Sequence, residues 1–308
     1  MRPRRPESRQ RLWVQDVNSE LVYQFQLLDD QGSLVASEDC TKVFVKPGVQ
    51  RIGVNQGRIQ GALFLPPPSN TAMKPPATRA VMTIYGAHMR GRAPEELAAL
   101  LASEGFVTFA TFYRVAVSDR EATEVEMFEE VVDYLLSLDQ VKDKRVHLWG
   151  ISRGGDMALA MAAFLGHKIG GVMCVNNGFV SCPGPTTYKD KLVKGTPVQV
   201  DFASKDIFKV AITEEEFRSS LELQFPVEDC QGPVLLVQGL ADTLLPLCKP
   251  GAEITRERAL QRGKHDFTVL QGQKFLSCSH CHELCQQVIW LLVGCSRVNN
   301  QSEARTAS

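Results

Sequence analysis

Residues 145–165 read RVHLWGISRGGDMALAMAAFL, and this stretch decides the fold of the chain. A short apolar run, VHLWG, ends at Gly150, and a helical pattern of Ala, Met and Leu begins after Gly155. Between them lies G-I-S-R-G, a match to G-x-S-x-G with Ser152 at its centre. In a nucleophile elbow such a serine occupies a sharp, strained turn between a strand and a helix, and the flanking glycines let the two approach without a clash of Cβ atoms.

The motif itself is a weak signal, because Gly and Ser are common in ordinary turns. Its context is more specific, since the elbow requires a strand before the motif and a helix after it, and the sequence predicts both. The turn would also aim the backbone N–H groups of the new helix at the hydroxyl, where an oxyanion can form. We therefore interpret Ser152 as a candidate nucleophile, with an ordinary strand–turn–helix as the alternative.

The composition is that of a globular protein with a substantial core: 44% of the 308 residues are hydrophobic and 22% are charged. The formal net charge is −1, so no overall field would draw the chain to nucleic acid or to a membrane surface. No run approaches the roughly 18 apolar residues that a membrane span needs. The nine cysteines are scattered and odd in number, which argues against a disulfide scaffold and favours a cytoplasmic location.

Two patterns divide the chain. Residues 12–54 and 60–65 read as short strands broken by turn signals such as D-D-Q-G. Two or three strands are not stable by themselves, so we expect this segment to pack on the part of the chain that follows. From Arg79 onward, near-continuous apolar strands alternate with helical patterns, including a predicted helix of about 20 residues that ends near Leu138. This alternation predicts a largely parallel sheet covered by helices on both faces.

A serine hydroxyl is a weak nucleophile until a base takes its proton and a third group orients that base. In enzymes with this elbow the chain order is Ser, then Asp or Glu, then His. Asp242 follows the predicted strand VLLVQG, residues 234–239, which places it at the same edge of the sheet as Ser152. Asp242 is the candidate triad acid, and a turn-forming Asp is the alternative.

Three histidines follow Asp242 and could act as the base. His265 precedes the predicted last strand, FTVLQ, so we expect it in a surface loop at the wrong end of the sheet. His280 and His282 follow that strand on the correct side, and their spacing alone does not choose between them. We rank His280 first because it lies closer to the strand end.

The same segment, CSHCHELC at residues 278–285, contains the Cys and His side chains that zinc favours, and C-x-x-C is a common half-site. The sequence has no second half-site at a useful separation. We therefore predict no metal site and interpret the segment as the Cys-rich start of a helix.

An oxyanion hole in such enzymes takes one N–H from the residue after the nucleophile, here Arg153, and one from the loop after an earlier strand. That loop is expected at residues 85–91, with Ala87 as the donor. Arg90 and Arg92 lie in or next to this loop, near the predicted opening of the site, and could bind phosphate groups. Alternatively, they are exposed charges that only keep the surface soluble.

A resemblance to a known family rests on three long stretches, KVFVKPGVQRIGVNQGRIQGALFLPP, EEVVDYLLSLDQVKDKRVHLWGISRGGDMALAMAAFL and FPVEDCQGPVLLVQGLAD. Over about residues 14–260 the chain resembles the acyl-CoA thioesterase and bile acid-CoA:amino acid N-acyltransferase family. The resemblance implies an N-terminal β-sandwich followed by an α/β-hydrolase domain. It also implies an enzyme that cleaves fatty acyl-CoA esters through an acyl-enzyme, or that passes a bile acyl group to glycine or taurine.

On the positions of that family, Ser152 matches the nucleophile and Asp242 the triad acid. The thioesterase branch has Ser or Cys at the first position, whereas the amidating branch typically carries Cys, so Ser152 favours hydrolysis. The chain also departs from the family pattern. By this comparison its N-terminal domain begins midway, and its oxyanion loop reads A-H-M-R-G where the family is Gly-rich. Its last strand continues as Q-G-Q-K-F, with Gln273 where the family has the histidine of Gly-His.

The whole sequence thus predicts an α/β protein, with a shortened β-sandwich-like segment at residues 1–68, an α/β-hydrolase domain with a mostly parallel central sheet at 69–298, and a disordered tail at 299–308. The predicted activity is hydrolysis of acyl-CoA thioesters without a cofactor, because acyl transfer from a thioester needs neither redox nor metal chemistry. One alternative is a catalytically impaired member that binds acyl-CoA or a protein partner, and another is an acyl-CoA:amino acid N-acyltransferase. Acyl chain length and oligomeric state do not follow from the sequence pattern.

Overall fold

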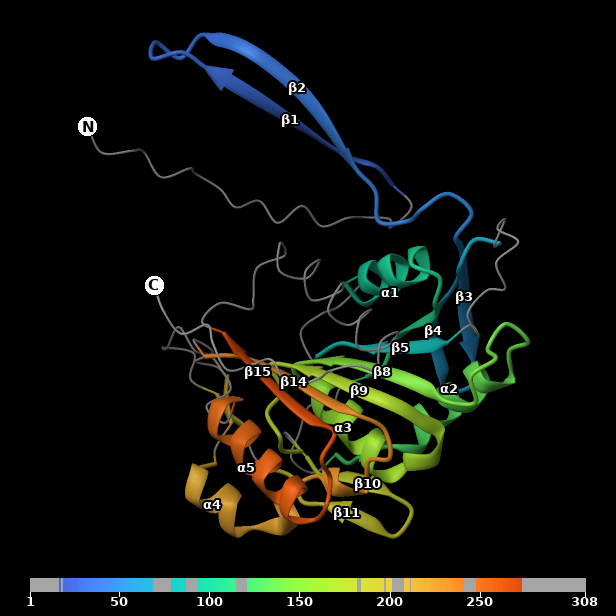
Figure 1. The fold of residues 1–308 in the computed structure, drawn as a ribbon, viewed down its shortest axis with the longest axis vertical. Coiled ribbons are helices and arrows are strands. Elements are labelled where there is room, and N and C mark those ends of the chain that lie inside the picture. Colours follow the sequence, from blue (N-terminus) through green and yellow to red (C-terminus); the bar gives the residue numbers. More distant parts are fainter. Residues whose placement is uncertain are drawn as a thin grey trace.

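An eight-stranded sheet forms the centre of the computed structural model (Figure 1). The structure describes residues 17, 19–68, 79–86, 93–114, 121–181, 184–196, 198–200, 208–210, 212–240 and 248–272. The strands of the sheet are β3 (Gln50–Gln56), β4 (Ile59–Leu65), β5 (Ala80–Ile84), β6 (Val107–Thr111), β8 (Val146–Ile151), β9 (Ile169–Val175), β14 (Val234–Gly239) and β15 (Phe267–Gly272). They lie in the order β15-β14-β9-β8-β5-β6-β4-β3.

Within the part of the chain that the structure describes, the strands of this sheet run in one direction except β4, which pairs antiparallel with both β3 and β6. From β6 to β15 every neighbouring pair is parallel. The carboxyl ends of these strands therefore meet at one edge of the sheet, where ligands of open α/β sheets bind. The predicted parallel sheet is confirmed, and the topology is that of the α/β-hydrolase fold.

Helices cover both faces of the sheet. They are α1 (Ala93–Ser103), α2 (Glu126–Ser137), α3 (Arg153–Phe164), α4 (Glu214–Ser219) and α5 (Cys248–Gln261), with short 3-10 turns at 166–168, 221–223 and 227–229. Figure 1 shows α1 above the sheet and α3 and α5 below it. Successive side chains of a strand point to opposite faces, so Leu148 of β8 packs with residues of α2 and α3, whereas Trp149 packs with residues of α1. No helix among the described residues is long and apolar enough to cross a membrane.

The helix predicted to end near Leu138 is shorter than expected. It is α2, which has 12 residues and ends at Ser137. The residues just before it form strand β7 (Thr123–Glu124), which pairs parallel with β10 (Thr186–Tyr188). The expectation of about 20 residues was wrong, because this pairing partner lies far along the chain and leaves no local pattern. The remaining short strands are β11 (Lys191–Val193), β12 (Val198–Val200) and β13 (Phe208–Val210).

The N-terminal strands divide between a hairpin and the large sheet. Strands β1 (Leu21–Leu28) and β2 (Leu34–Lys42) pair antiparallel, and in their turn the Asp29 carboxylate accepts two backbone N–H bonds. Figure 1 shows this hairpin standing away from the sheet, and its side chains are largely exposed. In contrast, β3 forms one edge of the large sheet, and β4 lies beside it. A domain boundary at residue 68 stays a prediction.

Candidate active site

Ser152 occupies a strained turn between β8 and α3. Its backbone angles are φ 56° and ψ −130°, and a positive φ is uncommon for a residue other than glycine. The turn is held by the Ser152 N–H, which donates to the Val175 carbonyl of β9 at 2.9 Å, and by the Ser152 carbonyl, which accepts from the Gly155 N–H at 2.8 Å. The strand, sharp turn and helix that the motif predicted are therefore all present.

The glycines around Ser152 are needed because helix and strands pack closely at this turn. A Cβ on Gly154 would lie 2.5 Å from the Ile84 carbonyl carbon of β5. A Cβ on Gly150 would lie 2.5 Å from the Gly155 Cα, and one on Gly155 would lie 2.7 Å from a side-chain carbon of Asn177. Real Cβ atoms do not approach so closely, so only glycine fits these positions.

The loop after β5 reaches the same turn. Gly86 lies against it, since a Cβ there would be 2.8 Å from the Ser152 Cβ and 3.2 Å from the Arg153 nitrogen. Arg153 is the first residue of α3, so its N–H has no acceptor within the helix. The loop is fixed by the Tyr113 hydroxyl, which donates to the Tyr85 carbonyl at 2.8 Å. The structure thus brings together a serine hydroxyl, a helix N–H that has no acceptor in its own helix, and the start of the predicted oxyanion loop.

Six other residues singled out in the sequence lie outside the described residues: Ala87, Arg90, Arg92, Asp242, His280 and His282. Their roles stay predictions. His265 is described and exposed, and it precedes β15, which runs parallel to β14 and β9. Ser152 follows the carboxyl end of β8, so His265 lies at the opposite edge of the sheet from the serine, as its place before the last strand led us to expect.

A buried polar cluster beside the turn was missed by the sequence analysis. The Asp156 carboxylate, 3% exposed, accepts the Phe179 N–H at 2.8 Å and an Asn177 side-chain N–H at 3.2 Å. The Asn177 side-chain oxygen in turn accepts an N–H from Gln238 of β14 at 2.9 Å. One signal was available: a lone Asp in the apolar run GGDMALAMAAF has to find partners if the helix is buried.

The electrostatics of this cluster are set by burial. Burial raises the pKa of the Asp156 carboxyl to about 7, against the opposing effects of the Arg153 guanidinium and of the donated hydrogen bonds. The Arg153 side chain is itself buried and donates to the Thr123 hydroxyl at 3.2 Å. The charge of Asp156 therefore changes within the neutral pH range.

Asn176 ties the ends of two strands together next to the turn. It follows Val175, has φ 45°, and its N–H donates to the Val237 carbonyl of β14 at 2.9 Å. Its side-chain oxygen accepts the Gly239 N–H at 2.6 Å. These bonds hold the carboxyl end of β14, the strand after which Asp242 comes in the sequence.

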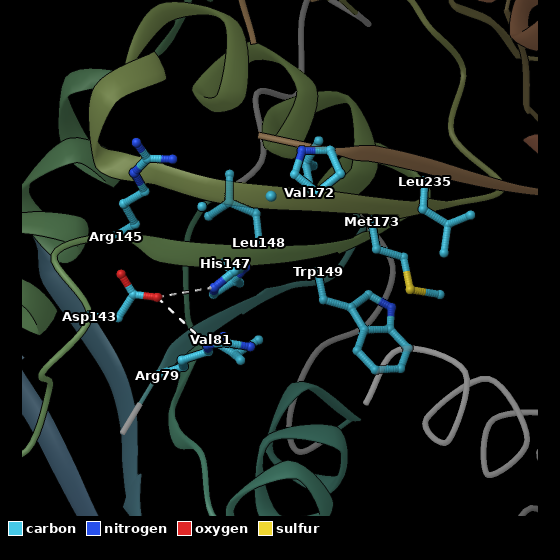
Figure 2. Close-up of a pocket in the computed structure, with 13 residues that line it drawn as sticks. Arg79, Val81, Asp143, Arg145, His147, Leu148, Trp149, Val172, Met173 and Leu235 are labelled. Carbon is cyan, nitrogen blue, oxygen red and sulfur yellow. Dashed lines mark ion pairs between the residues drawn. The ribbon is translucent and has the colours of Figure 1, made fainter. Parts of the chain in front are cut away.

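A pocket of about 310 Å³ lies at the other, amino-terminal edge of the sheet (Figure 2). There Asp143 forms an ion pair with Arg79 at 3.7 Å, and its carboxylate lies 3.8 Å from the His147 Nε2 atom. Burial lowers the pKa of His147 to about 4, so the imidazole is neutral at physiological pH. The pocket does not include Ser152.

In the described part of the chain, no group of three or more His, Cys, Asp or Glu side chains is placed to hold a metal ion. The Cys- and His-rich segment at residues 278–285 lies outside the described residues.

Comparison with known proteins gives this geometry a family context. A family profile described as BAAT / Acyl-CoA thioester hydrolase C terminal matches residues 123–276. Acyl-coenzyme A thioesterase 1 of Rattus norvegicus is 36% identical over 201 residues, which are 63% of this chain and 45% of that protein. Acyl-coenzyme A thioesterase 6 of Homo sapiens is 30% identical over 273 residues, which are 82% of this chain and 61% of that protein. The chain spans about half the length of the relatives it matches.

Solved structures with the same fold include serine hydrolases. The structure of FphF from Staphylococcus aureus, a fluorophosphonate-binding serine hydrolase with substrate bound, has a TM-score of 0.54 and 13% identity, covering 79% of this chain and 98% of that one. The structure of DcsB in complex with its substrate analogue has a TM-score of 0.51 and 14% identity, covering 80% and 99%. At these identities the likeness shows the fold alone.

Proposed function

The chain belongs to the BAAT / acyl-CoA thioester hydrolase family, and we propose on this basis that it hydrolyses acyl-CoA thioesters to free acid and CoA. The observation that carries the proposal is the strained turn at Ser152, where a hydroxyl lies beside the N–H of Arg153, which has no acceptor within its own helix. That pairing of nucleophile and oxyanion donor is what acyl transfer requires. The family match supplies the substrate class.

In the proposed mechanism, the Ser152 oxygen attacks the thioester carbonyl carbon as a histidine takes the hydroxyl proton. The oxyanion is stabilised by the N–H groups of Arg153 and Ala87, and collapse of the intermediate expels the CoA sulfur, which takes the proton from the histidine. Water, activated by the same histidine, then hydrolyses the acyl-enzyme. We propose His280 as this base, with His282 as the alternative, and Asp242 as the acid that holds its tautomer. None of these steps calls for a cofactor.

A second candidate, a catalytically impaired protein that binds acyl-CoA or a protein partner, is favoured by one observation. Strand β15 ends at Gly272, at the same sheet edge as Ser152, and the next residue is Gln273, where the family pattern has the triad histidine. Glutamine cannot act as a general base. Under the leading proposal the base comes from further along the chain, and under this second one no base is present.

Acyl-CoA hydrolysis by the purified protein tests the first proposal directly. Free thiol is followed over a series of acyl chain lengths, and Ser152→Ala is compared with Ser137→Ala, an exposed serine at the end of α2. We expect turnover by the wild type and by Ser137→Ala, and its loss in Ser152→Ala. His280→Ala and His282→Ala identify the base.

A folded wild type without turnover at any chain length would contradict the hydrolase proposal. Binding of a non-hydrolysable acyl-CoA thioether by that protein would favour the impaired member. Glycine or taurine added to the assay tests the acyltransferase alternative, because mass spectrometry separates an N-acyl product from free acid. The cytoplasmic location is likewise a proposal, and cell fractionation tests it.

A further inference from the structure

A buried carboxyl group in the first turn of an apolar helix needs an explanation. Asp156 lies on the first turn of α3, whose other buried residues are almost all Ala, Met, Leu or Gly. Burying a carboxylate is costly unless donors surround it. Its donors include the Phe179 N–H and the Asn177 side chain, both from the loop after β9. The carboxylate therefore links the helix of the serine turn to a neighbouring strand end.

The link continues to a third strand. Asn177 accepts a hydrogen bond from Gln238 at 2.9 Å, and Gln238 lies next to the last residue of β14. The following residue, Gly239, donates to Asn176 at 2.6 Å. Asn177 and Gln238 are both fully buried. Hydrogen bonds thus connect Asp156 of α3, through Asn177, to Gln238 of β14, the strand that precedes Asp242 in the sequence.

We propose that Asp156, Asn177 and Gln238 form a positioning network that fixes the Ser152 turn relative to the end of β14, the strand after which the proposed triad acid Asp242 comes in the sequence. This inference rests on the proposed function, because it deepens the account of that same site. In this proposal the three side chains are positioning residues, and the network acts through the backbone of α3 and of β14.

The network depends on the charge of Asp156. An ionised carboxylate accepts charge-assisted hydrogen bonds from its donors, and these bonds are about twice as strong as neutral ones. Among the described residues, the charged or titratable groups that face it are Arg153 on its own helix, Tyr113 after β6 and Cys174 on β9. Tyr113 and Cys174 are neutral at physiological pH, since burial raises the pKa of each. The network is therefore tightest when Asp156 has lost its proton and loosens on acidification.

The pH dependence of kcat separates this role from a merely structural one. In the wild type both the base and Asp156 must lose a proton, so the slope of log kcat against pH approaches about two on the acid side. In Asp156→Asn we expect a slope of about one and a kcat about tenfold lower at alkaline pH, with KM unchanged. Asp143→Asn removes the ion pair with Arg79 at the opposite edge of the sheet, and as the matched control it keeps both the wild-type slope and kcat.

A second variant tests the network from its other end. Gln238→Met is nearly isosteric and breaks the far end of the network while leaving Asp156 in place. We expect it to lower kcat severalfold, with KM and the acid slope unchanged. A wild-type kcat in both variants, or an acid slope that Asp156→Asn leaves unchanged, would overturn the inference.

Amide hydrogen exchange tests the coupling without any need for turnover. Asp156→Asn is expected to speed exchange at residues 176–181 and also at 238–240, and Gln238→Met is expected to speed it at 153–157. Changes confined to the mutated segment would overturn the network. If the wild type hydrolyses no thioester, the proposed function fails, and these exchange rates still decide whether the network exists.

Discussion

Replacement of Gly154 by alanine tests whether close packing or helix propensity governs the serine turn. Gly154 lies in the first turn of α3, where alanine is favoured over glycine by about 1 kcal/mol on propensity alone. Its new methyl group, however, would lie 2.5 Å from the Ile84 carbonyl carbon and 3.0 Å from the Tyr85 carbonyl carbon. Optimal carbon contacts are about 3.5–4.0 Å. Helix and strand would have to separate by about 1 Å.

This clash cannot be relieved by a side-chain rotation, because the atoms it meets are backbone atoms of β5, in the middle of the sheet. Overpacking in a core typically costs about 1–3 kcal/mol, and the Gly154→Ala change belongs at or above the upper end of that range. After the gain in propensity, we expect a net loss of about 2 kcal/mol in the free energy of unfolding. With a urea m-value of about 2 kcal/mol/M, the midpoint falls by about 1 M.

Urea unfolding followed by circular dichroism measures this loss, and Gly53→Ala is the matched control. Gly53 lies in β3 of the same sheet, and a Cβ there meets no atom within 4 Å. Alanine should leave stability unchanged there or raise it by roughly 0.5–1 kcal/mol, since glycine is entropically costly in a strand. A Gly154→Ala midpoint at or above that of the wild type would refute the packing account.

Three further predictions concern pH and the oxyanion loop. The unfolded chain protonates His147 near pH 6.5 but the folded chain only near pH 4, so about 3 kcal/mol of the free energy of unfolding is lost as pH falls through that window. Urea unfolding of His147→Gln should show this loss removed. A variant whose stability falls with acidification as steeply as that of the wild type would contradict the prediction. The pH effect of Asp156 on stability has the opposite sign. Its carboxyl keeps its proton up to about pH 7 in the folded state but only to about pH 3.8 in the unfolded state, so about 4 kcal/mol of the free energy of unfolding is lost as pH rises. Asp156→Asn should therefore unfold at higher urea than the wild type near pH 8. Gly86→Ala places a methyl group 2.8 Å from the Ser152 Cβ and should lower acyl-CoA hydrolysis about 100-fold; wild-type turnover would show that the loop tolerates displacement.

The sequence by itself determined the features that depend on local patterns. The glycines of GISRGG predict the tight strand-to-helix turn at Ser152. The sequence suffices for this prediction because glycine lacks a Cβ wherever it occurs in a fold. Apolar runs that alternate with helical periodicity likewise forecast a parallel sheet with both faces covered, since each strand has to bury side chains on two sides. His265 was placed correctly for a similar reason, as its position before a parallel strand fixes the edge on which it lies.

Only the tertiary structure decided which distant polar residues meet. Asp156, Asn177 and Gln238 come from three segments, and they become neighbours because β8, β9 and β14 are adjacent in the sheet. The start of α2 was misjudged for the same reason, since Thr123 pairs with Thr186 across 63 positions of sequence. A helix pairs residues at a fixed, short spacing, so its pattern is visible in the sequence. Pairings between distant segments depend instead on strand order, which the packing of the whole domain determines.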